Sequence, residues 1–311
     1  MEGVMSVKRI IVRVPATTAN LGPGFDCLGL ALDLWNETIF TFDGEGVMVE
    51  IQGYGKGQLP TDETNLIIKS FLSLFNKLGE KAPTGIKVTC QNNIPLGSGL
   101  GSSCAATLTG LFAANVYLGN PFDLEEILLM AADIEGHPDN AAAAAYGGLV
   151  ACIPSDKRLI IRRYEPASWV ISVLIPMIQL PTRESRAVLP SNVSMKDAVF
   201  NMGHTLLVVD AICKGDGELL AHSMQDRLHQ PYRLKLIPGA EAVFQAALEA
   251  GAVAAAISGA GPGLVAFSKS NSGKILNAMR SVVEKKSVES LGFELRITSQ
   301  SANVILETID Q

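Results

Sequence analysis

The sequence predicts a globular protein of two domains, each of which mixes strands and helices. Its 311 residues are enough for two domains of ordinary size. Hydrophobic residues make up 48% of the chain and charged residues 18%, which is typical of a protein with a well-formed core. A polar turn at residues 154–157 separates two groups of predicted elements. We therefore expect one domain over residues 1–156 and a second over residues 157–311.

The predicted elements of the first domain follow from the spacing of its apolar residues. Alternation predicts strands over residues 10–14, 37–42, 47–52 and 86–91. The first strand is expected to end at Pro15, and the second and third to pair across the turn at residues 43–46. Helical spacing predicts a helix of about 13 residues that ends near Gly79, a helix after residue 101 and a helix over residues 121–135.

Two further features complete the first domain. Asp123 and Glu126 have the spacing of a capping box at the start of the third helix, and Leu124, Ile127, Leu128, Ala131 and Ile134 are expected to form its buried stripe. Residues 141–154 are expected to form a strand of small residues with a kink at Gly147 and Gly148. This strand would close the domain.

The second domain is predicted to be of the βαβ type. It begins with an apolar strand over residues 169–175, and helices follow through residue 228. Strands over residues 253–257 and 264–267 flank a glycine-rich turn. A helix over residues 273–285 and a strand over residues 294–298 come last.

The composition argues against several classes of protein. The 25 basic and 31 acidic residues give a net charge of −6 without a long basic run, so nucleic-acid binding is not expected. The five scattered cysteines, never spaced as Cys-x-x-Cys, favour a reduced cytoplasmic chain without a structural metal site. The N-terminus lacks the long apolar core of a signal peptide, and the most apolar stretch, residues 141–153, is too short to span a membrane.

A glycine-rich loop with the sequence PLGSGLGSS lies at residues 95–103, between a predicted strand and a predicted helix. This arrangement points backbone N–H groups and the positive end of the helix at an anion, and the serines can cap the helix or donate hydroxyls. The loop lacks the Lys of the Gly-x-x-x-x-Gly-Lys phosphate loop and the glycine spacing of the dinucleotide fingerprint. By composition alone, an ordinary connector is as plausible as a phosphate site.

Two other segments carry polar residues that suggest a site. Residues 16–29 are short of bulky side chains and rich in hydrogen-bonding groups, which suits a cleft wall or a plain loop. Glu135 falls in the last helical turn, where the helix dipole disfavours a carboxylate unless a cation binds there, although a surface Glu would tolerate the position. His137 close to Asp139 suggests a general base, or a His that only orients the backbone.

Three motifs in this order, over residues 15–29, 95–103 and 258–263, resemble those of the GHMP kinase superfamily, which is named after galactokinase, homoserine kinase, mevalonate kinase and phosphomevalonate kinase. The first motif most resembles the homoserine kinase branch. The resemblance implies an α+β, two-domain GHMP-kinase fold whose N-terminal domain is like ribosomal protein S5 domain 2 and whose C-terminal domain is ferredoxin-like. It also implies that ATP with Mg²⁺ phosphorylates the side-chain hydroxyl of L-homoserine, a step of threonine biosynthesis.

The same resemblance implies a role for each matching residue. ATP would be bound by Asn65, Pro95, Leu96, Gly97, Ser98, Gly99, Leu100, Gly101, Ser102, Ser103, Cys104, Ala105, Gly259 and Gly261. The acceptor would be bound by Asn20, Asp26, His137, Asn140, Thr182, Arg186 and Arg233. Mg²⁺ would be bound by Glu135 with a hydroxyl from Thr107, Ser103 or Ser102, of which Thr107 aligns best. An Asn at the position of Asn65 is equally often a helix cap.

The resemblance also bears on catalysis. Asn140 and Arg186 would position the reacting hydroxyl, and Asp139 corresponds to the base proposed for mevalonate kinases. Because phosphoryl transfer can proceed by positioning and charge stabilisation alone, we do not expect Asp139 to be an essential base. Members of the superfamily usually carry Ser where this chain has Gly263. The alternatives are a mevalonate-type kinase or a non-catalytic ligand sensor on the same fold, and the oligomeric state stays open, with a homodimer as one alternative.

Overall fold

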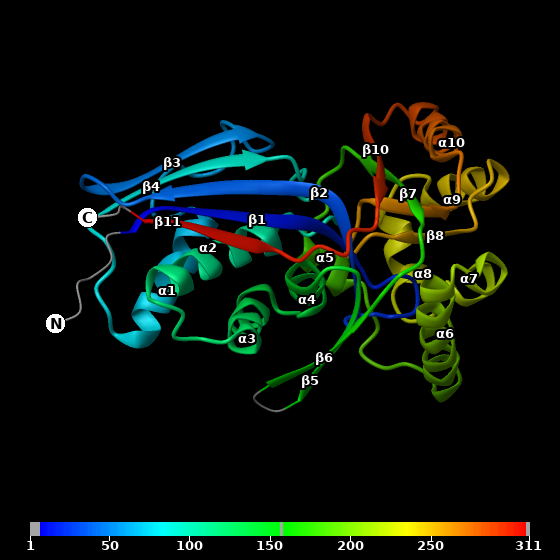
Figure 1. The fold of residues 1–311 in the computed structure, drawn as a ribbon. Coiled ribbons are helices and arrows are strands. Elements are labelled where there is room, and N and C mark those ends of the chain that lie inside the picture. The colour runs from blue at the N-terminus through cyan, green and yellow to red at the C-terminus, as the bar shows by residue number, and fades with distance from the viewer. Residues whose placement is uncertain (1–6, 156–157, 309–311) are drawn as a thin grey trace.

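The computed structural model describes residues 7–155 and 158–308, which form two sheets with their covering helices (Figure 1). Within these ranges, seven strands form the first sheet: β1 (Val7–Ala19), β2 (Leu28–Thr41), β3 (Gly46–Gly53), β4 (Gly85–Asn92), β5 (Leu149–Ser155), β6 (Arg158–Tyr164) and β11 (Asn303–Thr308). Figure 1 shows one face of this sheet covered by α1 (Leu66–Leu78), α2 (Ser102–Tyr117), α3 (Leu124–Glu135) and α4 (Asp139–Tyr146). The segment 1–6, which belongs to the first predicted domain, lies outside the described residues.

The second sheet has helices on both faces. In the described parts of the chain it has four strands in the order β10 (Ser290–Arg296), β7 (Val170–Pro176), β9 (Leu264–Ser268) and β8 (Ala254–Ile257). Ile171 and Val173 belong to the same apolar cluster as Val208 of α6 (Met195–Lys214), whereas Leu174 packs with the cluster under α9 (Ala240–Glu249) and α10 (Ser272–Glu284). This alternation of side chains along β7 gives the two faces separate cores.

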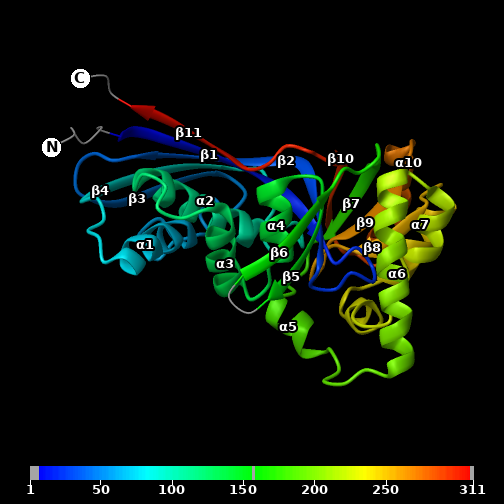
Figure 2. The ribbon, with the colours of Figure 1, turned by 60° about the horizontal axis from the view of Figure 1, so that its bottom comes forward.

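Four short helical elements connect the larger ones. They are α5 (Thr182–Ala187), α7 (Gly217–Ser223), α8 (Gln230–Arg233) and the 3₁₀ turn Leu234–Leu236. Figure 2 shows α5 beyond the end of the β5–β6 pair, with a long connection from there to α6. The predicted strands and helix of the second domain are confirmed, with shifts of a few residues at their ends. None of the helices in the described ranges is long and apolar enough to cross a bilayer.

The predicted pairing of residues 37–42 with residues 47–52 is wrong. The sheet order is β11-β1-β2-β4-β3, so β4 lies between the two strands. β3 pairs with β4 in parallel, and the connection between them contains α1. Parallel neighbours need such a long crossover, which the turn at residues 43–46 does not provide.

Two further predictions are corrected. β1 does not end at Pro15 but continues to Ala19, with a register shift between Pro15 and Ala16. Such a shift accommodates a proline within a strand. Residues 141–154 are not one strand: they form most of α4, which ends at Gly147 with φ 67°, and then β5. Alanine strongly favours helix, and because residues 139–145 are all buried, no polar face reveals the helical period.

The helices of the first domain follow their predicted signals closely. α1 ends at Gly79, and Asp123 and Glu126 form the predicted capping box of α3. Because Asp123 is the cap, α3 begins at Leu124 rather than at residue 121. Leu124 and Ile134 are not part of the buried stripe, since their side chains are 36% and 44% exposed.

The sheets do not separate at the polar turn of residues 154–157. β5 pairs with β6 in a hairpin across that turn, whose residues 156 and 157 are not described. The last strand, β11, returns to pair with β1 in the first sheet. The division at residue 156 stays a prediction, and the strand pairing favours a boundary near residues 165–169, with the C-terminal strand returning to the first domain.

Candidate active site

The glycine-rich loop adopts a backbone that only glycine adopts easily. Gly97, Gly99 and Gly101 have φ values of 59°, 77° and 71°. A Cβ atom at Gly99 would lie 2.2 Å from the Ser258 carbonyl oxygen, and one at Gly101 would lie 2.2 Å from Thr17 Oγ1. Gly101 is the N-cap of α2, and no side chain of the described residues caps that end. The free N–H groups of the first turn of α2 therefore remain available to an anion.

The third motif, residues 258–263, packs against this loop. The Ser258 hydroxyl donates to the Gly99 carbonyl at 2.7 Å, and Gly263 N donates to the Ser98 carbonyl at 3.1 Å. A Cβ at Gly263 would lie 2.2 Å from that Ser98 oxygen, so this chain has no room for the Ser that is usual there. The motif therefore contributes backbone and close packing to the loop.

Three neighbouring cavities share lining residues, and the first two of them border this loop. The first, of about 320 Å³, is bordered on one side by Gly97, Ser102 and Ser103 and otherwise mainly by apolar and amide groups, Asn65 among them. Asn65 also caps α1: its Oδ1 accepts from Ile67 N at 3.0 Å, and its Nδ2 donates to the Pro60 carbonyl at 2.7 Å. The capping alternative for Asn65 is therefore confirmed, and its side chain has few groups left to offer a ligand.

The second cavity, of about 150 Å³, joins the glycine loop to the turn of the third motif and to Glu135. The third is small, about 20 Å³, and all seven predicted acceptor residues line it: Asn20, Asp26, His137, Asn140, Thr182, Arg186 and Arg233. Three of these residues, His137, Asn140 and Thr182, line the second cavity as well as the third. A ligand in the third cavity would therefore lie next to a phosphate held by the loop.

Of the four candidate metal ligands, Ser102, Ser103 and Glu135 line the second cavity, and Thr107 contacts Glu135 at its edge. One oxygen of Glu135, the last residue of α3, accepts hydrogen bonds from Thr107 Oγ1 at 2.6 Å and from Ser103 Oγ at 3.0 Å. Ser103 and Thr107 stand one turn apart on α2. In the part of the chain that the structure describes, no group of three or more His, Cys, Asp or Glu is arranged so that it could hold a metal ion. Carboxylate and hydroxyl oxygens are the ligands that suit Mg²⁺.

Asp26 and Arg186 form a bidentate ion pair at the third cavity, with N–O distances of 2.7 and 3.0 Å. Burial lowers the pKa of Arg186, but the hydrogen bond and charge of Asp26 outweigh it, so that the pKa is raised. Both side chains remain about one-third exposed. Asn20 holds the loop in place, because it accepts from Asp26 N at 2.9 Å and donates to the Gly259 carbonyl at 2.8 Å.

Asp139 is buried at the third cavity, and one of its two carboxylate oxygens holds its neighbours in place. Its Oδ1 lies 2.7 Å from His137 Nδ1 and accepts from Asn140 N at 2.7 Å. Burial lowers the pKa of His137, but its hydrogen bond to the Asp139 carboxylate and the negative charge of that carboxylate outweigh burial, so the pKa is raised. Asn140 Oδ1 in turn accepts from the Thr17 hydroxyl at 2.7 Å. This arrangement orients Asn140 and His137 at the border of the two cavities.

Arg233 is a buried cation whose contacts are mostly to main-chain oxygens. It is 1% exposed and donates to the carbonyls of Ser185 and Gly259 at 3.1 and 3.2 Å. Burial, followed by repulsion from Arg186, lowers its pKa to about 10. It remains charged at neutral pH, and no carboxylate lies within ion-pairing distance of it among the described residues.

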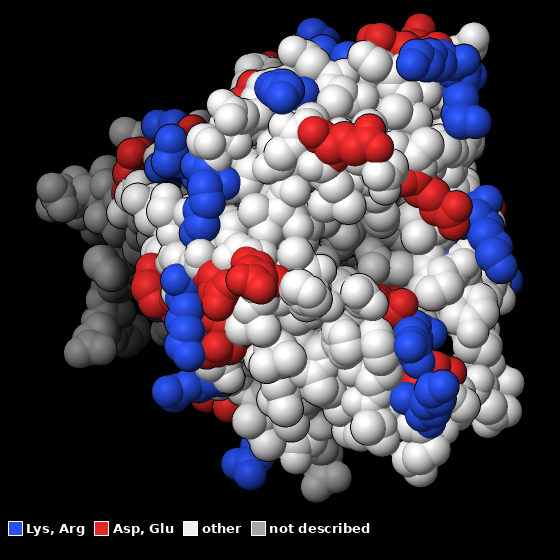
Figure 3. Space-filling view, turned by 90° about the vertical axis from the view of Figure 1, so that its right-hand side faces the viewer, with Lys and Arg blue, Asp and Glu red and all other residues white. Residues whose placement is uncertain are grey.

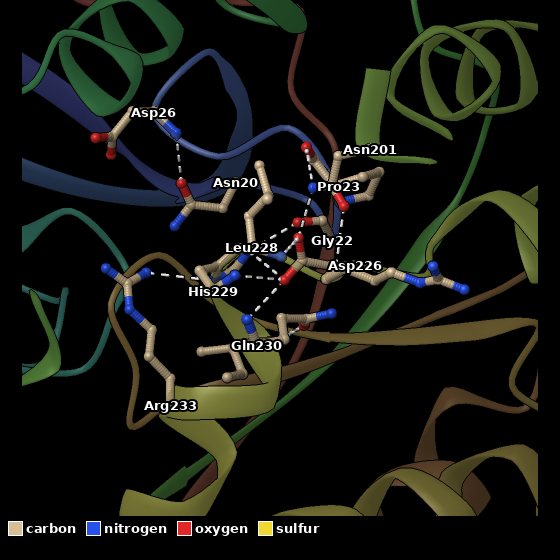
Figure 4. Close-up of polar contacts among 12 residues, drawn as sticks. Asn20, Gly22, Pro23, Asp26, Asn201, Asp226, Leu228, His229, Gln230 and Arg233 are labelled. Carbon is tan, nitrogen blue, oxygen red and sulfur yellow. Dashed lines mark hydrogen bonds and ion pairs between the residues drawn. The ribbon is translucent and has the colours of Figure 1, made fainter. Parts of the chain in front are cut away.

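Sequence reasoning missed the residues that hold this cation and the first motif in place (Figure 4). Asp226 accepts from Asn201 Nδ2 at 2.6 Å and from the backbone N–H groups of residues 228–230. His229 Nε2 donates to the Gly22 carbonyl at 2.7 Å, and its Nδ1 faces Arg233 Nη1 at 3.4 Å. The one signal in the sequence is that Asp226 lies shortly before a helix, which is typical of a helix cap. That signal does not indicate a buried carboxylate that accepts several hydrogen bonds.

Comparisons with known proteins agree with this geometry. The family model of the GHMP kinases N terminal domain matches residues 65–148, and that of the GHMP kinases C terminal domain matches residues 208–285. The homoserine kinase of Moorella thermoacetica is 43% identical over 95% of this chain and 99% of its own length. That of Gloeobacter violaceus is 47% identical over 82% of this chain and 86% of its own length.

The solved structures agree as well. The homoserine kinase from Cytophaga hutchinsonii superimposes with a TM-score of 0.83 at 33% identity and covers 96% of this chain and 98% of its own. The mevalonate kinase of L. major, at 16% identity and a TM-score of 0.68 over 97% of each chain, shares the fold alone.

Proposed function

The chain belongs to the homoserine kinase family of the GHMP kinases, and we propose that it transfers the γ-phosphate of ATP to the side-chain hydroxyl of L-homoserine. One observation supports this acceptor above others. The third cavity presents the carboxylate of Asp26 and the guanidinium groups of Arg186 and Arg233, and it adjoins the second cavity, which borders the glycine-rich loop. An amino acid carries an ammonium and a carboxylate, which match these charges. The acceptor of a mevalonate-type kinase has no ammonium for Asp26.

Binding of L-homoserine would change the ion pair between Asp26 and Arg186. The ammonium of the substrate would share or take over the Asp26 carboxylate, which would leave Arg186 available to a carboxylate or to the transferring phosphate. Arg233 keeps its charge and has no carboxylate partner among the described residues, so it suits the carboxylate of the substrate. The third cavity is small, and we expect the two side chains to move apart when the substrate enters.

ATP would extend along the other two cavities. Its phosphates would meet the N–H groups of the glycine loop and the start of α2, while the first cavity is large and apolar enough for the base. Glu135, with Thr107 and Ser103, would hold Mg²⁺, which neutralises charge on the phosphates when it is bound. Asn140 and Arg186 would orient the acceptor hydroxyl.

We propose that no side chain acts as an essential base. Asp139 is 2% exposed and already accepts from His137 and from Asn140 N, so it is best placed to orient its neighbours. An Asp139→Asn variant that folds and binds both substrates should keep measurable turnover. A collapse of turnover to the uncatalysed level with normal binding would contradict this.

The experiment that tests the activity is ADP release from MgATP with L-homoserine, D-homoserine, L-serine, mevalonate or galactose as acceptor. We expect turnover with L-homoserine only, and its loss in Asp26→Ala. Turnover with mevalonate or a sugar would keep the fold and overturn the acceptor. ATP binding without turnover on any acceptor would identify a sensor. We place the reaction in the cytoplasm, in keeping with five cysteines that are all described and all unpaired.

A further inference from the structure

Phe25, next to Asp26 in the first motif, lies against both arginines of the acceptor side. The centre of its ring is 5.6 Å from Cζ of Arg186 and 5.1 Å from Cζ of Arg233. A guanidinium group within about 6 Å of the centre of an aromatic ring is attracted by the negative face of that ring. Among the described residues, no other ring has two cations over it. Phe25 does not line the third cavity, so it would act on a substrate through these arginines.

The buried charge of Arg233 needs a substitute for the water that it has lost. Figure 3 shows one face of the molecule, on which the basic side chains lie at the surface and several have acidic side chains beside them. Arg233 is only 1% exposed, and no carboxylate lies within ion-pairing distance of it among the described residues. The carbonyls of Ser185 and Gly259 accept two of its hydrogen bonds, but they carry no net charge. The face of an aromatic ring is a further group of negative potential beside this cation.

The two guanidinium groups also repel each other. Burial lowers the pKa of Arg233 to about 10, and repulsion from Arg186 contributes to this shift. Asp26 offsets the repulsion, because it forms a bidentate ion pair with Arg186. An ammonium group that takes over the Asp26 carboxylate would remove this partner when both cations are needed for the acceptor. The ring of Phe25 is uncharged, so the charged groups of the acceptor do not compete for it.

The backbone of the first motif brings the carboxylate and the ring to the same arginine. Asp26 has φ 56°, a left-handed conformation that residues other than glycine rarely adopt. Neighbouring side chains of an extended chain point to opposite sides, whereas Phe25 and Asp26 both contact Arg186. The buried ring of His229 stacks on that of Phe25, with 5.2 Å between the ring centres and 26° between the planes. The ring of Phe25 is therefore held from a distant part of the chain.

We propose that Phe25 is a positioning residue of the acceptor site, whose ring keeps the guanidinium groups of Arg186 and Arg233 together at the third cavity. The proposal rests on the proposed function for the identity of the acceptor. The negative face of the ring offsets the repulsion between the two cations while the ammonium group of the substrate occupies Asp26. Because the ring acts on binding groups, its loss should raise KM for L-homoserine more than it lowers kcat.

The test changes the charge distribution of the ring and keeps its shape. Phe25 is replaced by mono-, di- and trifluorophenylalanine, because each fluorine weakens the negative face with little change in size. KM for L-homoserine should rise stepwise, to about tenfold in the trifluoro variant, and KM for ATP should stay constant. Phe25→Leu should raise KM for L-homoserine at least as much, and Phe25→Tyr should stay close to the wild type.

The matched control is Phe244→Leu on α9. Phe244 is half-buried and has no cation over its ring among the described residues, so both KM values should stay unchanged. A KM for L-homoserine that does not respond to fluorination would overturn the proposal. A parallel rise in both KM values would overturn it as well, because that result would indicate general damage to the fold.

A second measurement needs no acceptor. Phe25→Leu, Arg233→Met and the double variant form a mutant cycle on the unfolding equilibrium, in which methionine keeps an apolar stem without the charge. The double variant should raise the unfolding constant by about tenfold less than the product of the two single effects. Additive effects would overturn the contact between ring and cation. A wild-type chain without turnover on L-homoserine would overturn the proposed acceptor instead, and the cycle would still show whether the ring supports Arg233.

Discussion

The two ends of the candidate active site are built by different means. On the nucleotide side, one continuous segment, residues 95–105, presents backbone groups that are held by the turn at residues 258–263. On the acceptor side, side chains from separate segments, between Asn20 and Arg233, meet around one small cavity. A backbone site depends on the absence of side chains, whereas a side-chain site depends on charges and their supports. The two sides should therefore fail under different substitutions.

The largest effect is expected from a single added methyl group on the nucleotide side. In Gly99→Ala the Cβ would lie 2.2 Å from the Ser258 carbonyl oxygen, so the loop and the turn must move apart. Displaced backbone donors should lower kcat/KM for ATP by about 10²–10³-fold. Steady-state kinetics with ATP as the varied substrate measures this.

Gly97→Ala is the matched control in the same loop. Gly97 has φ 59°, also in the left-handed region, but a Cβ there would meet no atom within 4 Å. The expected cost is the left-handed conformation alone, about 1–2 kcal/mol of unfolding free energy, with a change in kcat/KM that stays well below that of Gly99→Ala. Equal losses of kcat/KM in the two variants would show that close packing against residue 258 is not the reason why the loop needs glycine at position 99.

This difference also explains how much of the molecule the sequence predicts. The glycine loop, the capping box at Asp123 and the end of α1 at Gly79 are local signals, and each was predicted correctly. Features that depend on distant partners were not predicted: the placement of β4 between β2 and β3, and the identity of α4, whose buried alanines show no polar face.

The site shows the same division. Family resemblance selected the acceptor residues one by one, and the structure brings them to one cavity. It did not predict that Asp26 pairs with Arg186, because the two lie 160 residues apart. Nor did it suggest Asp226 and His229, whose importance comes from burial and from the groups that surround them. Side-chain networks of this kind depend on the fold, and a local pattern cannot reveal them.

A charge change should affect the acceptor side alone. Asp26→Asn keeps the size of the side chain but removes the charge that would bind an ammonium, so KM for L-homoserine should rise about 10–100-fold. KM for ATP should change little. The loss should disappear with an acceptor analogue that lacks the ammonium group. Asp133→Asn, on the exposed surface of α3, is the control and should match the wild type. Parallel rises in both KM values would contradict the separation of the two sides.

A smaller effect is expected where the two sides meet, at the hydroxyls on Glu135. Thr107→Val keeps the shape of the side chain and removes the hydroxyl, so the Mg²⁺ concentration for half-maximal rate should rise about tenfold. Thr107→Ser should restore the wild-type requirement. Ser103→Ala should have a weaker effect, because its hydroxyl lies farther from Glu135, at 3.0 Å against 2.6 Å. The opposite ranking would make Ser103 the principal hydroxyl ligand.

The smallest effect is a pH dependence of stability that arises from the supports of the acceptor side. Burial lowers the pKa of His229, and the positive charge of Arg233 lowers it further. The charge of Asp226, the hydrogen bond to Gly22 and the charge of Asp26 act in the opposite direction without reversing the shift. The geometry agrees, since Nε2 donates to Gly22 and Nδ1 faces a guanidinium, which is the arrangement of a neutral ring. Below pH about 6.5 the unfolded chain gains a proton that the folded chain does not bind. The unfolding free energy should therefore fall as pH drops from about 6.5, by at most about 1.4 kcal/mol per pH unit, until the folded pKa is reached.

His229→Gln removes this titration. The slope of its unfolding free energy against pH should therefore be smaller than that of the wild type, by the contribution of one proton. Urea denaturation between pH 5 and 8, about 1.5 units on either side of the usual His pKa, measures this slope. His222→Gln is the control, because His222 is exposed and should leave the slope unchanged. Identical slopes in all three proteins would mean that His229 is charged in the fold. Arg233 would then face a second cation, and the acceptor side would need another explanation for how its charges are held together. The nucleotide side, whose contacts are backbone groups that do not titrate in this range, should show no matching change in ATP binding.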